Sequence, residues 1–216
     1  MTDAVRATNA VTLPPAHTDS TDFPTYVPVT ASADFAEFVS TMRRFQDLAS
    51  SSDPDDHTWR SATVHLNALT ALLEPHQAAE GRPPAGRALE LPGMGNPLLP
   101  PWRITAAGPD GTTLHGHFSR YYLGANGIVL GGALPLLFDW TFAIAVTAAG
   151  RPLSRTGYLN IDYRKPTRID TDLTVAAQVI DIDGRKTTLT AALIDAEGTV
   201  LAEAETLMIG LQAHHQ

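Results

Sequence analysis

Asp139 is the residue whose position most clearly suggests chemistry. It is the only charged residue between Arg120 and Arg151, inside the nearly continuous apolar segment 128–149. If that segment is a buried helix, desolvation raises the pKa of the carboxyl group. A carboxylate perturbed in this way is a candidate general base or nucleophile. The simpler alternative is that Asp139 only caps or orients neighbouring backbone.

Two glycines, Gly131 and Gly132, directly precede this helix, and Pro135 falls in its first turn, where proline costs no hydrogen bond. Such a helix start exposes backbone N–H groups and the positive end of the helix dipole. These groups can stabilise negative charge that develops on a carbonyl oxygen. The alternative for the glycine pair alone is an ordinary tight turn.

Local basicity is a third feature, in a chain whose formal net charge is −8. Two predicted turns together hold both lysines of the chain: Arg164, Lys165 and Arg168 lie in one, and Gly184, Arg185 and Lys186 in the other. Clustered cations in an acidic protein are consistent with phosphate binding. Either cluster alone is explained as simply by solvated turn charges.

Composition and motifs exclude several classes of protein. The negative net charge argues against nucleic acid as the partner, and the lack of cysteine excludes disulfides and thiolate chemistry. His115 and His117 share one face of a predicted strand but lack a third ligand nearby, so no metal site is predicted. The N-terminus does not resemble a signal peptide, and Asp139 makes segment 128–149 a poor membrane span. We therefore expect a cytoplasmic protein.

The elements that must position these residues follow from periodicity. Apolar residues at helical spacing predict helices at 34–48, with Ser32 as its cap, and at 59–73. The hairpin of these helices is assigned to residues 31–80, after a flexible or loosely docked arm at 1–30. A proline-rich linker is expected at 81–101.

The C-terminal half, residues 102–212, shows the pattern of strands around one helix. Strands are predicted at 103–107, 112–119, 156–163, 172–182, 186–194 and 199–209. Because the intervening helix is apolar nearly all round, several sides of it must be covered. The prediction is an α+β domain in which a curved antiparallel sheet wraps around a central helix.

Residues 127–139, Gly-Ile-Val-Leu-Gly-Gly-Ala-Leu-Pro-Leu-Leu-Phe-Asp, resemble the signature of the PaaI-type hotdog thioesterases, including their THEM4-like branch. The similarity continues through 159–166, where a strand ends in Tyr-x-x-Pro, and covers roughly residues 101–210. It implies the hotdog fold and hydrolysis of an acyl-coenzyme A (CoA) thioester, without a cofactor, because CoA is part of the substrate.

The resemblance also implies roles for individual residues. Asp139 would be the catalytic carboxylate, acting as general base or nucleophile, and the Gly131 or Gly132 amide would polarise the thioester carbonyl. The Thr156 hydroxyl would help to hold the attacking water across a dimer interface. Such enzymes work as homodimers or dimers of dimers with shared active sites.

Substrate contacts are implied for Asn126, Leu130, Arg164, Lys165, Arg168, Gly184, Arg185 and Lys186. Leu130 departs from the family pattern, which has histidine there. If that histidine positions the substrate carbonyl, its loss lowers turnover on the order of 10²–10³-fold; if it only supports the loop, activity survives. The alternative function is therefore a non-catalytic acyl-CoA-binding protein of the same fold.

Overall fold

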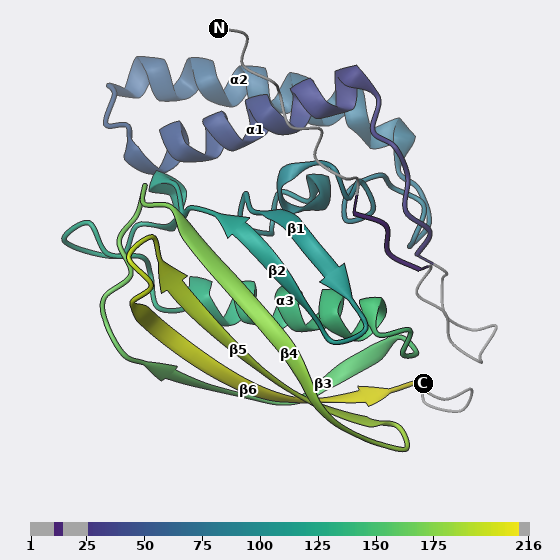
Figure 1. Ribbon diagram of the computed structural model, residues 1–216. Helices are drawn as coiled ribbons and strands as arrows, with labels where there is room; N and C mark the ends of the chain where they lie inside the picture. Colours follow the sequence, from purple (N-terminus) through teal and green to yellow (C-terminus); the bar gives the residue numbers. More distant parts are fainter. Residues whose placement is uncertain (1–10, 15–25, 212–216) are drawn as a thin grey trace, which may run out of the picture.

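Residues 11–14 and 26–211 are described by the computed structural model of the chain (Figure 1). Its helices are α1 (Ala33–Ser51), α2 (Asp56–Leu73) and α3 (Ala133–Ala148), with short 3-10 turns η1 (Glu74–His76), η2 (Pro92–Gly95) and η3 (Arg120–Tyr122). Its strands are β1 (Arg103–Gly108), β2 (Gly111–Gly116), β3 (Ser154–Tyr163), β4 (Leu173–Asp183), β5 (Lys186–Asp195) and β6 (Val200–Gly210).

The strands form one antiparallel sheet in the order β1-β2-β4-β5-β6-β3. β3 follows α3 in the chain but pairs with the C-terminal strand β6, so β1 and β3 are the edges of the sheet. The sheet curves around α3 (Figure 1). This confirms the predicted hotdog arrangement.

The core lies between α3 and the concave face of the sheet. Leu137, Phe138 and Phe142 of α3 are fully buried and pack with inward-facing residues such as Val175 and Leu189. Burying a side chain of this size contributes roughly 1.5–3 kcal/mol. α3 is therefore held in place mainly by apolar contacts.

One stripe of α3 stays uncovered, and this corrects the prediction that Asp139 is buried. Gly132, Asp139 and Ala143 are exposed and Leu136 is half-buried, at the three- and four-residue spacing of a single helix face. The sheet covers the opposite face, so in a single chain the carboxylate of Asp139 reaches solvent. None of the helices in the described ranges combines the length and apolar character that crossing a membrane requires.

The predicted helical hairpin is present but is attached through α1 alone. Ser32 caps α1 as expected, its hydroxyl accepting a hydrogen bond from the Phe35 amide at 3.1 Å. In contrast, α2 has no buried residue, and its Val64 and Leu72 side chains are both 66% exposed. Most of the apolar stripe that predicted α2 is thus exposed within the described chain, and of its leucines only Leu69 is half-buried.

The N-terminal arm and the proline-rich segment are more closely attached than their composition suggests. Leu13 is buried in the core, and the Val29 amide donates to the Arg87 carbonyl; the rest of the arm, at 1–10 and 15–25, lies outside the described residues. The segment after Leu91 packs against α1, where the guanidinium of Arg43 donates hydrogen bonds to three of its carbonyls.

Candidate active site

Asp139 and Thr156 form a directly bonded pair. The Thr156 hydroxyl, on β3, donates to Oδ1 of Asp139, in the second turn of α3, at 2.6 Å. A hydroxyl bound to a carboxylate this closely makes a charge-assisted hydrogen bond, which restrains the orientation of the carboxyl group. No described residue donates to Oδ2, so this oxygen is open to a proton from water. Thr156 therefore orients the acid within one chain.

A β-bulge places Thr156 on the side of the sheet that faces α3. The β3–β6 register shifts between Thr156 and Tyr158, so that Thr156 opposes Met208 while Tyr158 opposes Leu207. Met208 is buried on the concave face. Simple alternation with Leu159 and Ile161 would put Gly157 on that face; the bulge puts Thr156 there instead.

Gly131 and Gly132 form an open helix start, as the sequence predicted. α3 begins at Ala133 with Gly132 as its N-cap, and both glycines are exposed. A Cβ at either would meet nothing within 4 Å, and no described residue accepts a hydrogen bond from either N–H. These amides are free to bind an anionic or polarised oxygen.

Tyr163 is part of the site but was not predicted as a site residue. Its hydroxyl donates to the Gly131 carbonyl at 2.9 Å. The signal available in the sequence was its place at the end of the strand that begins near Thr156. β3 therefore contacts α3 twice, with Thr156 at Asp139 and Tyr163 at the helix start.

The spacing along α3 limits the chemistry of one chain. Gly132 and Asp139 are seven residues apart, about 10 Å along the helix axis. Asp139 cannot attack directly a carbonyl carbon held about 3 Å from the Gly132 amide of the same chain. Either a water bridges the two groups, or the carbonyl faces Asp139 of a second chain.

A pocket of about 400 Å³ lies beside the helix start. It is lined by Ile128, Val129, Gly131, Leu134, Tyr163, Arg164, Lys165, Pro166 and Thr167. Thr167 is 3% exposed, and its Oγ1 has no hydrogen-bond partner among the described residues. The structure thus brings the first predicted basic turn next to the glycine pair.

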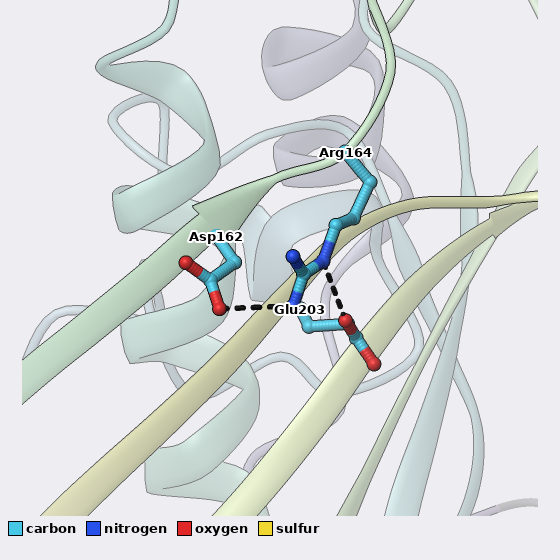
Figure 2. A network of polar contacts seen from close by, with 3 residues as sticks. All are labelled: Asp162, Arg164 and Glu203. Carbon is cyan, nitrogen blue, oxygen red and sulfur yellow. Dashed lines mark hydrogen bonds and ion pairs between the residues drawn. The ribbon is translucent and has the colours of Figure 1, made fainter.

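Arg164 in that turn is already paired with acids. Its guanidinium donates to Glu203 at 2.7 Å and to Asp162 at 3.0 Å (Figure 2). The hydrogen bond to Glu203 and the charges of both carboxylates raise the pKa of Arg164 above its ordinary value. The two negative charges of Asp162 and Glu203 exceed the single positive charge of Arg164. Lys165 and Arg168 are exposed and make no side-chain bond to a described residue, so they are the better cations for binding a phosphate.

The second basic turn lies at the other end of the sheet. Lys186 pairs with Ile209, which also pairs with Arg155 near the start of β3, whereas Arg164 follows the end of β3. At about 3.3 Å per residue the two turns are roughly 26 Å apart along β3. The two basic turns of one chain therefore cannot both contact the same phosphate group. Arg185 also donates to the Gly210 carbonyl at 3.1 Å.

The other predicted contact residues sit at the surface. Leu130 is 59% exposed directly before Gly131, so an apolar side chain borders the helix start. Asn126 is exposed at a positive φ of 52° in the turn that precedes this segment. The His115 ring hydrogen-bonds with the Thr174 hydroxyl at 3.3 Å. No cluster of three metal-binding side chains occurs in the part of the chain that the structure describes.

Comparison with known proteins confirms the resemblance at superfamily level. Residues 126–202, which include Asp139, Thr156 and Tyr163, match the family model of the thioesterase superfamily. No curated protein sequence matches the chain. The narrower assignment to the THEM4-like branch stays a prediction.

One of the similar solved structures shares the fold over most of the chain. A thioesterase superfamily protein is 24% identical with a TM-score of 0.71, over 87% of this chain and 98% of its own. A hypothetical thioesterase with coenzyme A from Streptococcus pneumoniae is 19% identical (TM-score 0.49; 51% and 90% covered). A mutant of the phenylacetic acid degradation protein PaaI from Thermus thermophilus is 21% identical (TM-score 0.47; 51% and 93% covered). The likeness to the first extends well into the N-terminal half.

Proposed function

We propose that this chain, whose residues 126–202 match the thioesterase superfamily, hydrolyses acyl-CoA thioesters to a free acid and CoA. The observation that carries the proposal is the Thr156–Asp139 pair at 2.6 Å on the same exposed helix face as the open amides of Gly131 and Gly132. A base and an oxyanion-binding site are the two parts that acyl transfer to water requires.

In this mechanism Asp139 acts as a general base. Its free Oδ2 takes a proton from a water molecule whose oxygen bonds to the thioester carbon. The carbonyl oxygen becomes an oxyanion bound by the Gly131 or Gly132 N–H. The oxyanion then re-forms the carbonyl of the acid as the C–S bond breaks, and the protonated Asp139 gives its proton to the departing CoA sulfur. The separation of about 10 Å along the helix supports a bridging water or a second chain over direct attack within one chain.

The substrate would approach through the pocket beside Gly131. Lys165 lines this pocket and Arg168 directly follows the lining residue Thr167, and these two cations would bind CoA phosphates. The exposed side chain of Leu130 would contact an apolar part of the substrate. Asn126 is a surface residue of the same loop. Gly184, Arg185 and Lys186 would contact the substrate of a neighbouring chain, because they lie too far from this pocket in their own chain. No cofactor is needed, and a cytoplasmic location stays a prediction.

Leu130 supports the second candidate function, a non-catalytic acyl-CoA-binding protein. No polar side chain stands at this position to assist the carbonyl. Such a protein would bind acyl-CoA without releasing thiol.

The test is free-thiol release from a panel of short, medium, long and aromatic acyl-CoAs. Asp139→Asn should lower kcat roughly 10²–10⁴-fold, because general-base catalysis contributes about that factor. Asp181→Asn is the matched control, since Asp181 is exposed on β4 and makes no side-chain bond to a described residue. Equal rates for the Asp139→Asn variant and the unaltered chain would refute the mechanism. Binding without thiol release by the unaltered chain would establish the binding protein instead.

A further inference from the structure

We propose that the Tyr163 hydroxyl positions the Gly132 amide and so prepares the oxyanion-binding site, an inference that rests on the function proposed above. Tyr163 would be a positioning residue, because it acts through the peptide group between Gly131 and Gly132.

The geometry of that peptide group is the first step. The Gly131 carbonyl and the Gly132 N–H belong to one planar trans unit, so they point in opposite directions and move together. The Tyr163 hydroxyl donates to this carbonyl at 2.9 Å, whereas the Leu134 amide of the first helical turn donates to it at 3.3 Å. Tyr163 therefore makes the closer of the two contacts that fix the Gly132 N–H.

The glycine pair needs such an anchor. Glycine has the greatest backbone freedom of any residue, and neither Gly131 nor Gly132 has packing neighbours where a Cβ would stand. An oxyanion is stabilised well only by donors that already point at it. A hydrogen bond to a peptide carbonyl also polarises the unit and strengthens its N–H as a donor.

The fold directs Tyr163 to this place. Along β3, Leu159, Ile161 and Tyr163 oppose Thr206, Ala204 and Ala202 of β6, whose side chains are buried on the concave face. Tyr163 ends this row and lines the pocket with Gly131. The buried, unpaired Oγ1 of Thr167 in the same pocket is a separate indication that the pocket receives a polar ligand.

Tyr158 offers a matched control on the same strand. It faces the other side of the sheet, and its hydroxyl donates to Glu205 at 2.6 Å. Both tyrosines are partly exposed, Tyr158 at 39% and Tyr163 at 56%, so replacing either with phenylalanine should leave the fold intact. Both substitutions remove a tyrosine hydroxyl oxygen, Tyr163→Phe at the start of α3 and Tyr158→Phe away from it.

The experiment compares Tyr163→Phe with Tyr158→Phe in two measurements. With the best acyl-CoA of the panel, Tyr163→Phe should lower kcat about tenfold with KM within about twofold, because one net hydrogen bond is lost mainly in the transition state. In ¹⁵N-labelled protein without substrate, its Gly132 amide resonance should move and exchange faster. Tyr158→Phe should change neither quantity.

The outcomes separate this inference from the proposed function. An unchanged kcat in Tyr163→Phe, with the unaltered chain active, would overturn the positioning role and leave the thioesterase assignment standing. A higher KM at constant kcat would identify Tyr163 as a substrate contact and would also overturn its positioning role. If the unaltered chain released no thiol, the thioesterase proposal and the catalytic part of the Tyr163 proposal would both be refuted. A Gly132 amide resonance that stayed unchanged in Tyr163→Phe would then also refute the positioning of this amide by Tyr163.

Discussion

The hydrogen bond from Thr156 makes the two oxygens of Asp139 different from each other. Oδ1 is engaged at 2.6 Å, and Oδ2 has no donor among the described residues. A general base benefits from this difference, because its basic oxygen then points in one direction and need not rotate before it takes a proton.

Thr156→Val removes the hydroxyl and preserves the shape of the side chain. We expect kcat to fall about 10–100-fold, the effect of one hydrogen bond to a charged group. Thr156→Ser keeps the hydroxyl and should retain most of the activity, since it can donate the same bond. Steady-state thiol release measures both; a valine variant as active as the serine variant would show that the bond has no catalytic part.

For single residues, the sequence predicted which side chains belong to the candidate site better than it predicted their burial and contacts. Gly132 and Asp139 lie on one exposed face of α3 and Thr156 is bonded to Asp139, while the catalytic roles of these residues stay predictions. The burial of Asp139 was wrong for the single chain, because periodicity shows that a helix is apolar and does not show which of its faces a sheet covers. Tyr163 was missed because its contact is with a backbone carbonyl, which no side-chain motif reveals.

Among the elements, β3 depends on the bulge beside Gly157. It puts Thr156 and Tyr163, seven residues apart, on the same face, where strict alternation would have put them on opposite faces. Strand positions were predicted to within a few residues because alternation and turn residues are local. The bulge was not, since it depends on how β3 pairs with β6, a strand far along the chain.

The segment from η2 to the start of β1 is fixed to α1 by the guanidinium of Arg43. Its guanidinium donates to the carbonyls of Leu99, Pro92 and Asn96, each at 3.0 Å. Burial lowers the pKa of Arg43 from its ordinary value, so these carbonyls replace water around the charge. Composition predicted only a linker here; the contact explains why it is ordered.

Arg43→Met should lower the free energy of unfolding by about 2–4 kcal/mol, because three carbonyls lose a charged donor together. Arg44→Met is the control: Arg44 is exposed on the same helix, and its loss should change stability by no more than about 0.5 kcal/mol. Urea unfolding gives both values. Equal destabilisation by the two substitutions would mean that Arg43 does not hold the segment.

For the whole molecule, two features that no described residue covers adjoin each other: the exposed stripe of α3 and the edge strand β3. We propose that a second copy of the chain covers them, which would bury Asp139 and complete a shared site. An exposed strand edge is open to pairing in this way. The sequence predicted a homodimer or dimer of dimers only through the resemblance.

Sedimentation velocity should then give at least twice the chain mass of 23.1 kDa. Ala143→Arg puts a charge on the exposed stripe and should yield single chains with reduced activity, because the charge would be desolvated on association. Ala68→Arg, a similar exposed position on α2, should leave the mass and the activity unchanged. An unaltered chain that sediments as one copy would refute the shared site.

The three tryptophans give the chain optical reporters of its own. Trp102 and Trp140 are buried, and the Trp140 indole donates to the Met94 sulfur at 3.3 Å, so their emission reports on the core. Trp59 on the uncovered helix α2 is 42% exposed and reports on the surface. Any partner that covers this helix would move the emission of Trp59 to shorter wavelength, and association at the hairpin would be visible without a label.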